Sequence, residues 1–158
     1  MDHVKTGGFK LIGIKLPGQT TNAGGQSNID CGNLWQQFLT GNVKNNIPGK
    51  ISDDIFAVYF GYEGDHTKPF SFFIGCKVGI DTRTPPGMDG LFIPRENYYR
   101  FLAKGKMPDC VANTWKEIWT SKIGRAYKYD FEVYGDRSQN RNDAEVEIYL
   151  SSNDINRT

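Results

Sequence analysis

The chain has 158 residues and a net charge of +1, and 38% of its residues are hydrophobic and 13% aromatic. This composition suits a single folded domain over residues 1–158, with a core over about 8–151 and polar tails over 1–7 and 152–158. The balanced charge speaks against direct nucleic-acid binding. Because the sequence has neither a long apolar run nor a signal-like N-terminus, we expect a cytoplasmic protein without membrane contact.

The cysteine pattern argues against a disulfide framework and against a zinc site. Cys31, Cys76 and Cys110 are an odd number of widely spaced cysteines, and no CxxC pair occurs. His3 and His66 are isolated, and no glycine-rich nucleotide loop is present. We therefore expect neither a metal ion nor a cofactor.

The first half of the chain is predicted to be one strand, one helix and two further strands. Alternation favours a strand over 9–16, and apolar residues at helical spacing favour a helix over 28–40. β-branched and aromatic residues then indicate strands over 55–62 and 70–78, which form a hairpin.

The second half repeats this order. A strand over 91–102, interrupted by Pro94, is followed by a helix over 108–123 and by strands over 127–134 and 144–150. The order strand–helix–strand–strand thus occurs twice.

Local sequence also repeats, because Leu34-Trp35-Gln-Gln-Phe38 resembles Thr114-Trp115-Lys-Glu-Ile118. The prediction is an α+β fold from a duplicated half-domain, with helices on one face of a mainly antiparallel sheet.

The strand predicted over 127–134 has two different faces. Tyr129, Phe131 and Val133 alternate with Glu132 and its neighbours, and we expect this apolar face to pack beneath the helices. Glu132 then lies on the opposite face, among aromatic residues of neighbouring strands. Such a face indicates a ligand groove containing one acid, although a dimer interface or simple β-propensity also explains the aromatics.

Several segments resemble the GyrI-like (gyrase-inhibitory-protein-like) small-molecule-binding superfamily, which also supplies the effector-binding part of AraC-type and multidrug-responsive transcription activators. They include Ile12-Gly-Ile-Lys, Leu34-Trp35-Gln-Gln-Phe38, Phe56-Ala-Val-Tyr59-Phe-Gly-Tyr62-Glu63 and Tyr129-Asp-Phe-Glu132-Val-Tyr134. The resemblance implies two strand–helix–strand–strand modules related by a pseudo-twofold axis. It also implies a groove, with the helices on the outer face.

In that family an acid in the Asp-Phe-Glu-x-Tyr strand meets planar cations, and the matching residue is Glu132. Burial among aromatic walls should raise the pKa of this carboxyl, and a bound cation would relieve the cost. Tyr134, Tyr62 and Phe60 share the inferred groove register, whereas Tyr59 would face the helices. The other candidates, some of which also suit the core, are Trp35, Trp115, Trp119, Tyr98, Phe101 and Tyr149.

The favoured function is a stand-alone protein that binds amphipathic, aromatic and often cationic small molecules. The resemblance implies two alternatives. One is a hydrolase of cyclopropane-bearing DNA-alkylating compounds, in which Glu132 would be catalytic by positioning or deprotonating water. The other is a protein-binding inhibitor of gyrase.

Overall fold

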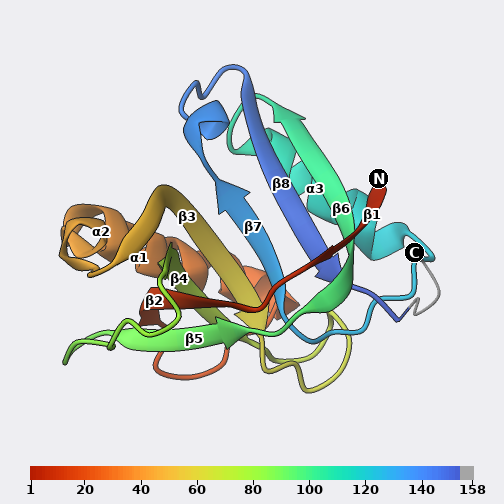
Figure 1. The fold of residues 1–158 in the computed structure, drawn as a ribbon. Coiled ribbons are helices and arrows are strands. Elements are labelled where there is room, and N and C mark those ends of the chain that lie inside the picture. Colours follow the sequence, from red (N-terminus) through yellow and green to blue (C-terminus); the bar gives the residue numbers. More distant parts are fainter. Residues whose placement is uncertain (154–158) are drawn as a thin grey trace.

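Eight antiparallel strands form one sheet in residues 1–153, the part of the chain that this computed structural model describes, and helices pack on one of its faces (Figure 1). The strands are β1 (Asp2–Thr6), β2 (Phe9–Lys15), β3 (Lys50–Phe60), β4 (Ser71–Val78), β5 (Asp89–Ile93), β6 (Glu96–Gly105), β7 (Asp130–Tyr134) and β8 (Ala144–Ser151). The helices are α1 (Gln26–Thr40), α2 (Val43–Asn46) and α3 (Asp109–Thr120), with short 3₁₀ turns η1 (Ala23–Gly25) and η2 (Asp136–Ser138).

The strand order confirms the predicted duplication. It runs β1-β6-β8-β7-β3-β4-β2-β5, so β2-α1-β3-β4 and β6-α3-β7-β8 are equivalent modules that meet at the β3–β7 pair. Each module places its third strand between the other two. β1 and β5 form the two outer edges of the sheet. β1 precedes the first module but pairs with β6 of the second, whereas β5 follows the first module and pairs with β2, its first strand.

The structure corrects three predicted boundaries. The predicted polar tail 1–7 contains β1, which pairs with β6 and is reinforced by an ion pair between Asp2 and Arg100 at 2.7 Å. Pro94 separates two strands that pair with different neighbours, β5 with β2 and β6 with β8. β7 begins only at Asp130, and Tyr127 has a left-handed backbone (φ 53°) that interrupts the extended segment predicted from alternation.

At the C-terminus, the predicted polar tail over 152–158 begins with a bridge between Ser152 and Arg125. The rest of that predicted tail, 154–158, lies outside the described residues.

The sheet curls around an apolar cluster on the face away from the helices. Val4 of β1 and Ile93 of β5 belong to the same cluster, although these strands are the opposite edges of the sheet. Phe131 of β7 lies within it, 2% exposed, and contacts Tyr98. The curl thus buries one face of the sheet without covering helices, and α1 and α3 lie on the outer face (Figure 1).

Two further clusters attach the helices to the outer face. Leu34 and Phe38 of α1 pack on β2, β3 and β4, whereas Cys110 and Ile118 of α3 pack on β6 and β8. Each helix therefore covers its own module and leaves the β3–β7 junction between them. No helix within residues 1–153 has the length and apolar character needed to cross a bilayer.

Candidate functional site: a pocket between the helices

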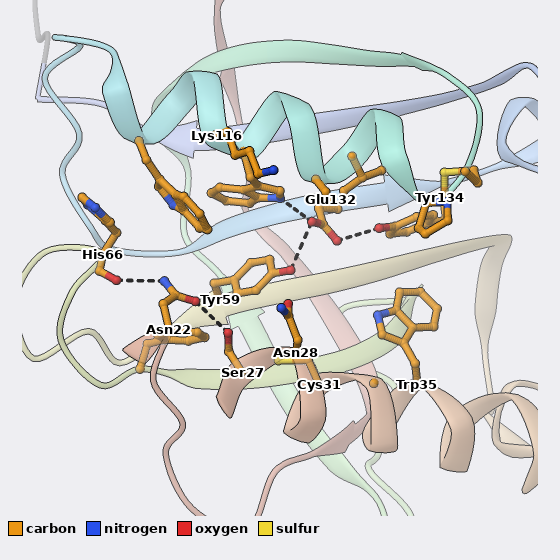
Figure 2. A pocket seen from close by; sticks show the side chains of 18 of the residues that line it. Asn22, Ser27, Asn28, Cys31, Trp35, Tyr59, His66, Lys116, Glu132 and Tyr134 are labelled. Carbon is orange, nitrogen blue, oxygen red and sulfur yellow. Dashed lines mark hydrogen bonds between the residues drawn. The ribbon is translucent and has the colours of Figure 1, made fainter. Parts of the chain in front are cut away.

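A cavity of about 410 Å³ lies above the β3–β7 junction, between α1 and α3. Its wall consists of Asn22, Ser27, Asn28, Cys31, Gly32, Trp35, Tyr59, Tyr62, His66, Phe70, Met107, Pro108, Val111, Ala112, Trp115, Lys116, Trp119, Arg125, Glu132 and Tyr134. The volume is within the range of small-molecule sites. The cavity opens to solvent beside Asn28 of α1 and Lys116 of α3, two exposed residues of its wall (Figure 2).

Helical spacing explains how α1 and α3 build the two side walls. Asn28, Cys31 and Trp35 recur every three or four residues on α1, and Trp115 and Trp119 are four residues apart on α3. Residues at such spacing share one face of a helix. The three tryptophans of the chain therefore all line one cavity.

Glu132 lies at the base of the cavity and is held by three donors (Figure 2). Its Oε2 accepts hydrogen bonds from Trp115 Nε1 at 2.6 Å and from the Tyr59 hydroxyl at 3.1 Å, and its Oε1 accepts one from the Tyr134 hydroxyl at 2.8 Å. Opposite Glu132 in β3 is Ala57, which is fully buried. The donors come from α3, β3 and β7, so the carboxylate has a fixed orientation.

Burial determines the electrostatics of this group. Glu132 is 2% exposed, and the loss of hydration raises the pKa of its carboxyl above the ordinary glutamate value, while the hydrogen bonds from Trp115, Tyr134 and Tyr59 oppose that rise. Burial and the nearby Glu132 charge raise the pKa of both tyrosine hydroxyls well above 10. The tyrosines consequently remain protonated donors at neutral pH.

A second buried carboxylate, Asp130, joins the sheet to the segment after α3. Its Oδ2 accepts hydrogen bonds from the Tyr62 hydroxyl at 2.7 Å and from Arg125 Nη2 at 2.8 Å. Its Oδ1 accepts from the backbone and hydroxyl of Ser151 at 2.7 and 2.9 Å. Asp130 is not part of the cavity wall, but it holds Tyr62 and Arg125, which are.

Aromatic pairs form most of the remaining wall. Trp35 meets Tyr134 edge to face at 5.0 Å, and Tyr59 meets Trp115 similarly at 5.2 Å. His66 stacks on Trp119 with ring centroids 5.7 Å apart, and Trp119 is 38% exposed. The wall therefore presents flat ring surfaces around one carboxylate, an arrangement that suits planar cationic groups.

The raised thiol pKa of Cys31 argues against covalent chemistry at this position. Burial, with a further contribution from Glu132, raises the pKa of the Cys31 thiol to about 12. The reactive thiolate is therefore scarce at neutral pH. Within residues 1–153, no group of three or more histidine, cysteine, aspartate or glutamate side chains is arranged to hold a metal ion.

The structure brings six of the ten predicted site residues into the cavity wall. They are Glu132, Tyr134, Tyr62, Trp35, Trp115 and Trp119. Their contact with a ligand stays a prediction. The other four, Phe60, Tyr98, Phe101 and Tyr149, lie outside the wall.

These four residues pack in the apolar clusters of the sheet instead. Phe60 stacks on Tyr129 at 5.7 Å in the cluster inside the curl, and Tyr149 stacks there on Phe131 at 4.7 Å. Tyr98 is fully buried in the same cluster. Phe101 packs beside the cluster under α3.

The corrections have a common cause. Alternation identifies residues that share a face, but the prediction placed the helices on the wrong face of β7. The groove lies on the same face as the helices, and Tyr59 is in its wall while Phe60 points inside the curl. Tyr62 reaches the wall despite sharing parity with Phe60, because Gly61 has φ 61° and ends the alternation.

Small lining residues occur at the mouth, and one of them provides a stability test. Gly32 is exposed in the middle of α1, and a Cβ added there would meet no atom within 4 Å. We expect Gly32→Ala to raise the free energy of unfolding by about 0.5–1 kcal/mol, because alanine has the higher helix propensity. Urea unfolding would measure this gain, and a loss of stability would contradict the open space seen beside Gly32.

Sequence comparison places this architecture among effector-binding proteins. Residues 4–151 match the Cass2 family of integron-associated effector binding proteins. The chain is also 28% identical over 121 residues to YobU of Bacillus subtilis, a protein named for transcriptional regulation, and the match covers 75% of this chain and 74% of YobU.

Solved structures show the same fold. An integron cassette protein from the mobile metagenome of Vibrio cholerae superposes with a TM-score of 0.70 and 26% identity, covering 95% of this chain and 94% of that one. SAV2435, solved with bound tetraphenylphosphonium, superposes with a TM-score of 0.70 and 19% identity, covering 96% of this chain and 93% of SAV2435. A protein from Staphylococcus aureus MU50, described as a bacterial transcription regulation protein, superposes with a TM-score of 0.71 and 19% identity, covering 95% of each chain.

Proposed function

Because the chain belongs to the integron-associated effector binding protein family, with the GyrI-like fold, we propose that it binds amphipathic, aromatic and often cationic small molecules in the pocket between α1 and α3. The observation that carries this proposal is Glu132, a carboxylate 2% exposed and surrounded by aromatic rings.

The energetics favour a cation over a neutral ligand. A buried carboxylate loses hydration, and neutral hydrogen-bond donors restore only part of that loss. A cation restores more of it, since opposite charges interact strongly at reduced dielectric. Each ring face adds about 0.5–2 kcal/mol of cation–π attraction. Tetraphenylphosphonium in SAV2435, a protein of the same fold, is a ligand of this chemical kind.

Two ions of nearly equal shape test the proposal. Tetraphenylphosphonium is a cation and tetraphenylborate is an anion. We expect the cation to bind with micromolar affinity and at least tenfold more tightly than the anion, because only the cation carries the charge opposite to Glu132. Since all three tryptophans line the cavity, their fluorescence quenching reports binding directly, and calorimetry gives an independent affinity. Equal affinity for both ions would contradict the role of Glu132.

The hydrolase alternative is tested with a strained electrophile. If Glu132 positions or deprotonates water, a cyclopropane-bearing alkylating agent should gain one water molecule, and Glu132→Gln should abolish that reaction. Mass spectrometry of the compound after incubation measures it. A binding protein returns the compound intact. Co-purification with gyrase would instead support the inhibitor alternative.

A further inference from the structure

The pocket wall contains positive charge besides Glu132. Among the described residues, three side chains in the wall carry formal charge, namely Lys116, Arg125 and Glu132, and two of these are positive. Asp130 offsets one of them from outside the wall, so net charge alone selects no ligand. A cation whose donors are not all used can still bind an anionic group of a ligand.

Arg125 is the stronger candidate, because it is buried and incompletely paired. Its side chain is 5% exposed, and Nη2 pairs with Asp130 at 2.8 Å. Within residues 1–153, its Nε and Nη1 have no hydrogen-bond partner. Buried charged donors without acceptors are costly, so such groups are commonly completed by a water molecule or a ligand.

The position of Arg125 relative to Glu132 defines a bipolar site. Trp115 donates to Glu132 through its indole Nε1, and the guanidinium carbon of Arg125 lies 5.8 Å from the same indole ring. The indole of Trp115 thus lies next to both of these charged groups.

Tyr127 covers the guanidinium and must shift for an acceptor to reach it. The Tyr127 ring centroid lies 4.2 Å from the guanidinium carbon, and Nε and Nη1 are both shielded from the cavity surface. Tyr127 lies between α3 and β7, and its φ of 53° is unfavourable for a tyrosine. Because Tyr127 lies outside the strands, a displacement of its ring leaves the pairing of the sheet in place.

From these observations we propose that the pocket takes amphoteric aromatic ligands, with the cationic group at Glu132 and an oxyanion, such as a carboxylate, at Nε and Nη1 of Arg125. This inference rests on the proposed function and specifies the ligand class. Arg125 would determine specificity and would have no part in a reaction.

Rhodamine B and its ethyl ester provide matched probes. Both carry the same xanthylium cation, but only rhodamine B has a free carboxylate. We expect the unaltered protein to bind rhodamine B about tenfold more tightly than the ester at pH 8, because a charge-assisted hydrogen bond is lost in the ester. Fluorescence anisotropy measures both affinities. Equal affinities, or tighter binding of the ester, would overturn the inference.

Two variants assign the preference to a residue. Arg125→Lys keeps a charge that can pair with Asp130 but removes the free Nε and Nη1 donors. The ratio of the affinities for rhodamine B and its ester should therefore fall from about tenfold to about threefold or less, while the affinity for the ester stays unchanged. Lys122→Gln, at an exposed position outside the wall, should leave the preference intact. A preference that survives Arg125→Lys would place the oxyanion elsewhere, and one that disappears in Lys122→Gln would reflect net charge; either result would overturn the assignment.

A measurement on the unaltered protein covers the case in which Arg125→Lys fails to fold. The Nε–H resonance of Arg125 should shift on binding rhodamine B and stay in place with the ester, and an unmoved resonance with both would overturn the inference. Tetraphenylphosphonium separates this test from the proposed function. If it binds and the dyes show no preference, only the amphoteric class fails, whereas loss of tetraphenylphosphonium binding as well would contradict both proposals.

Discussion

Glu132→Gln should weaken tetraphenylphosphonium binding by about 1–3 kcal/mol, or roughly 5- to 150-fold, because the substitution keeps the side-chain shape and removes the charge that we propose to pair with the ligand. Tetraphenylborate should bind to the variant as well as before or better. The amide oxygen of glutamine can still accept from Trp115, so the wall should keep its form. Calorimetric titration of both ions measures the two effects.

Glu117→Gln is the matched control for this experiment. Glu117 is exposed on α3 and is not part of the cavity wall, and its substitution changes the net charge by the same amount. The control should bind both ions as the unaltered protein does. If Glu132→Gln weakens cation and anion equally, then Glu132 supports the shape of the pocket and does not pair with the ligand. Similar losses in the two variants would indicate a general effect of net charge.

The order of strands and helices along the chain and the module duplication were predictable, because they depend on local periodicity. β3, β4 and β8 alternate apolar with polar residues or are rich in β-branched and aromatic residues. The long helices α1 and α3 have apolar residues at helical spacing. β1 was not readable, since Asp2–Thr6 is mostly polar and owes its extended form to pairing with β6. Such edge strands depend on a neighbour that is distant in sequence, and no local pattern records it.

The acid of the pocket was predictable, whereas its side of the sheet was not. Glu132 and Tyr134 are two residues apart in a strand, so they share a face whatever covers it. Deciding which face the helices cover requires knowledge of the curl. An apolar face normally indicates helix packing, but here Phe131 is buried against Phe9 and Tyr98, side chains of other strands of the curled sheet. The error at Phe60 follows from that curl, whereas Tyr59 faces the helices as predicted and contacts Trp115 of α3.

Arg125 illustrates a functional candidate that periodicity cannot reveal. It lies between α3 and β7, outside the regular helices and strands, and its partner Asp130 is five residues away in sequence. Its importance rests on burial and on two unpaired nitrogens. The four-residue spacing of Trp115 and Trp119, by contrast, was a usable signal that one helix face lines a common surface.

The pH dependence of cation binding should follow Glu132. Tetraphenylphosphonium has a permanent charge, and the proposed function pairs it with the ionised carboxylate. Its affinity should therefore be highest above the raised pKa of Glu132 and should fall as the pH drops through that pKa, approaching tenfold per pH unit below it. The fall should begin at higher pH than an ordinary glutamate permits. Titrations between pH 8 and pH 5, with circular dichroism to verify folding, measure this profile.

The stability of the free protein should change with pH in the opposite sense. A carboxyl whose folded pKa is raised contributes stability that is fully present below its unfolded pKa and lost as the pH rises through the folded pKa. The Glu132→Gln variant has no carboxyl to ionise at this position, so its melting temperature should rise relative to that of the unaltered protein as the pH increases. Its affinity for the cation should be weaker and should not change with pH. Parallel profiles in the two proteins would mean that another group controls the titration.

A bound cation lowers the pKa of Glu132 and should therefore restore the stability of the unaltered protein at neutral pH. Thermal melts with and without tetraphenylphosphonium would detect this effect.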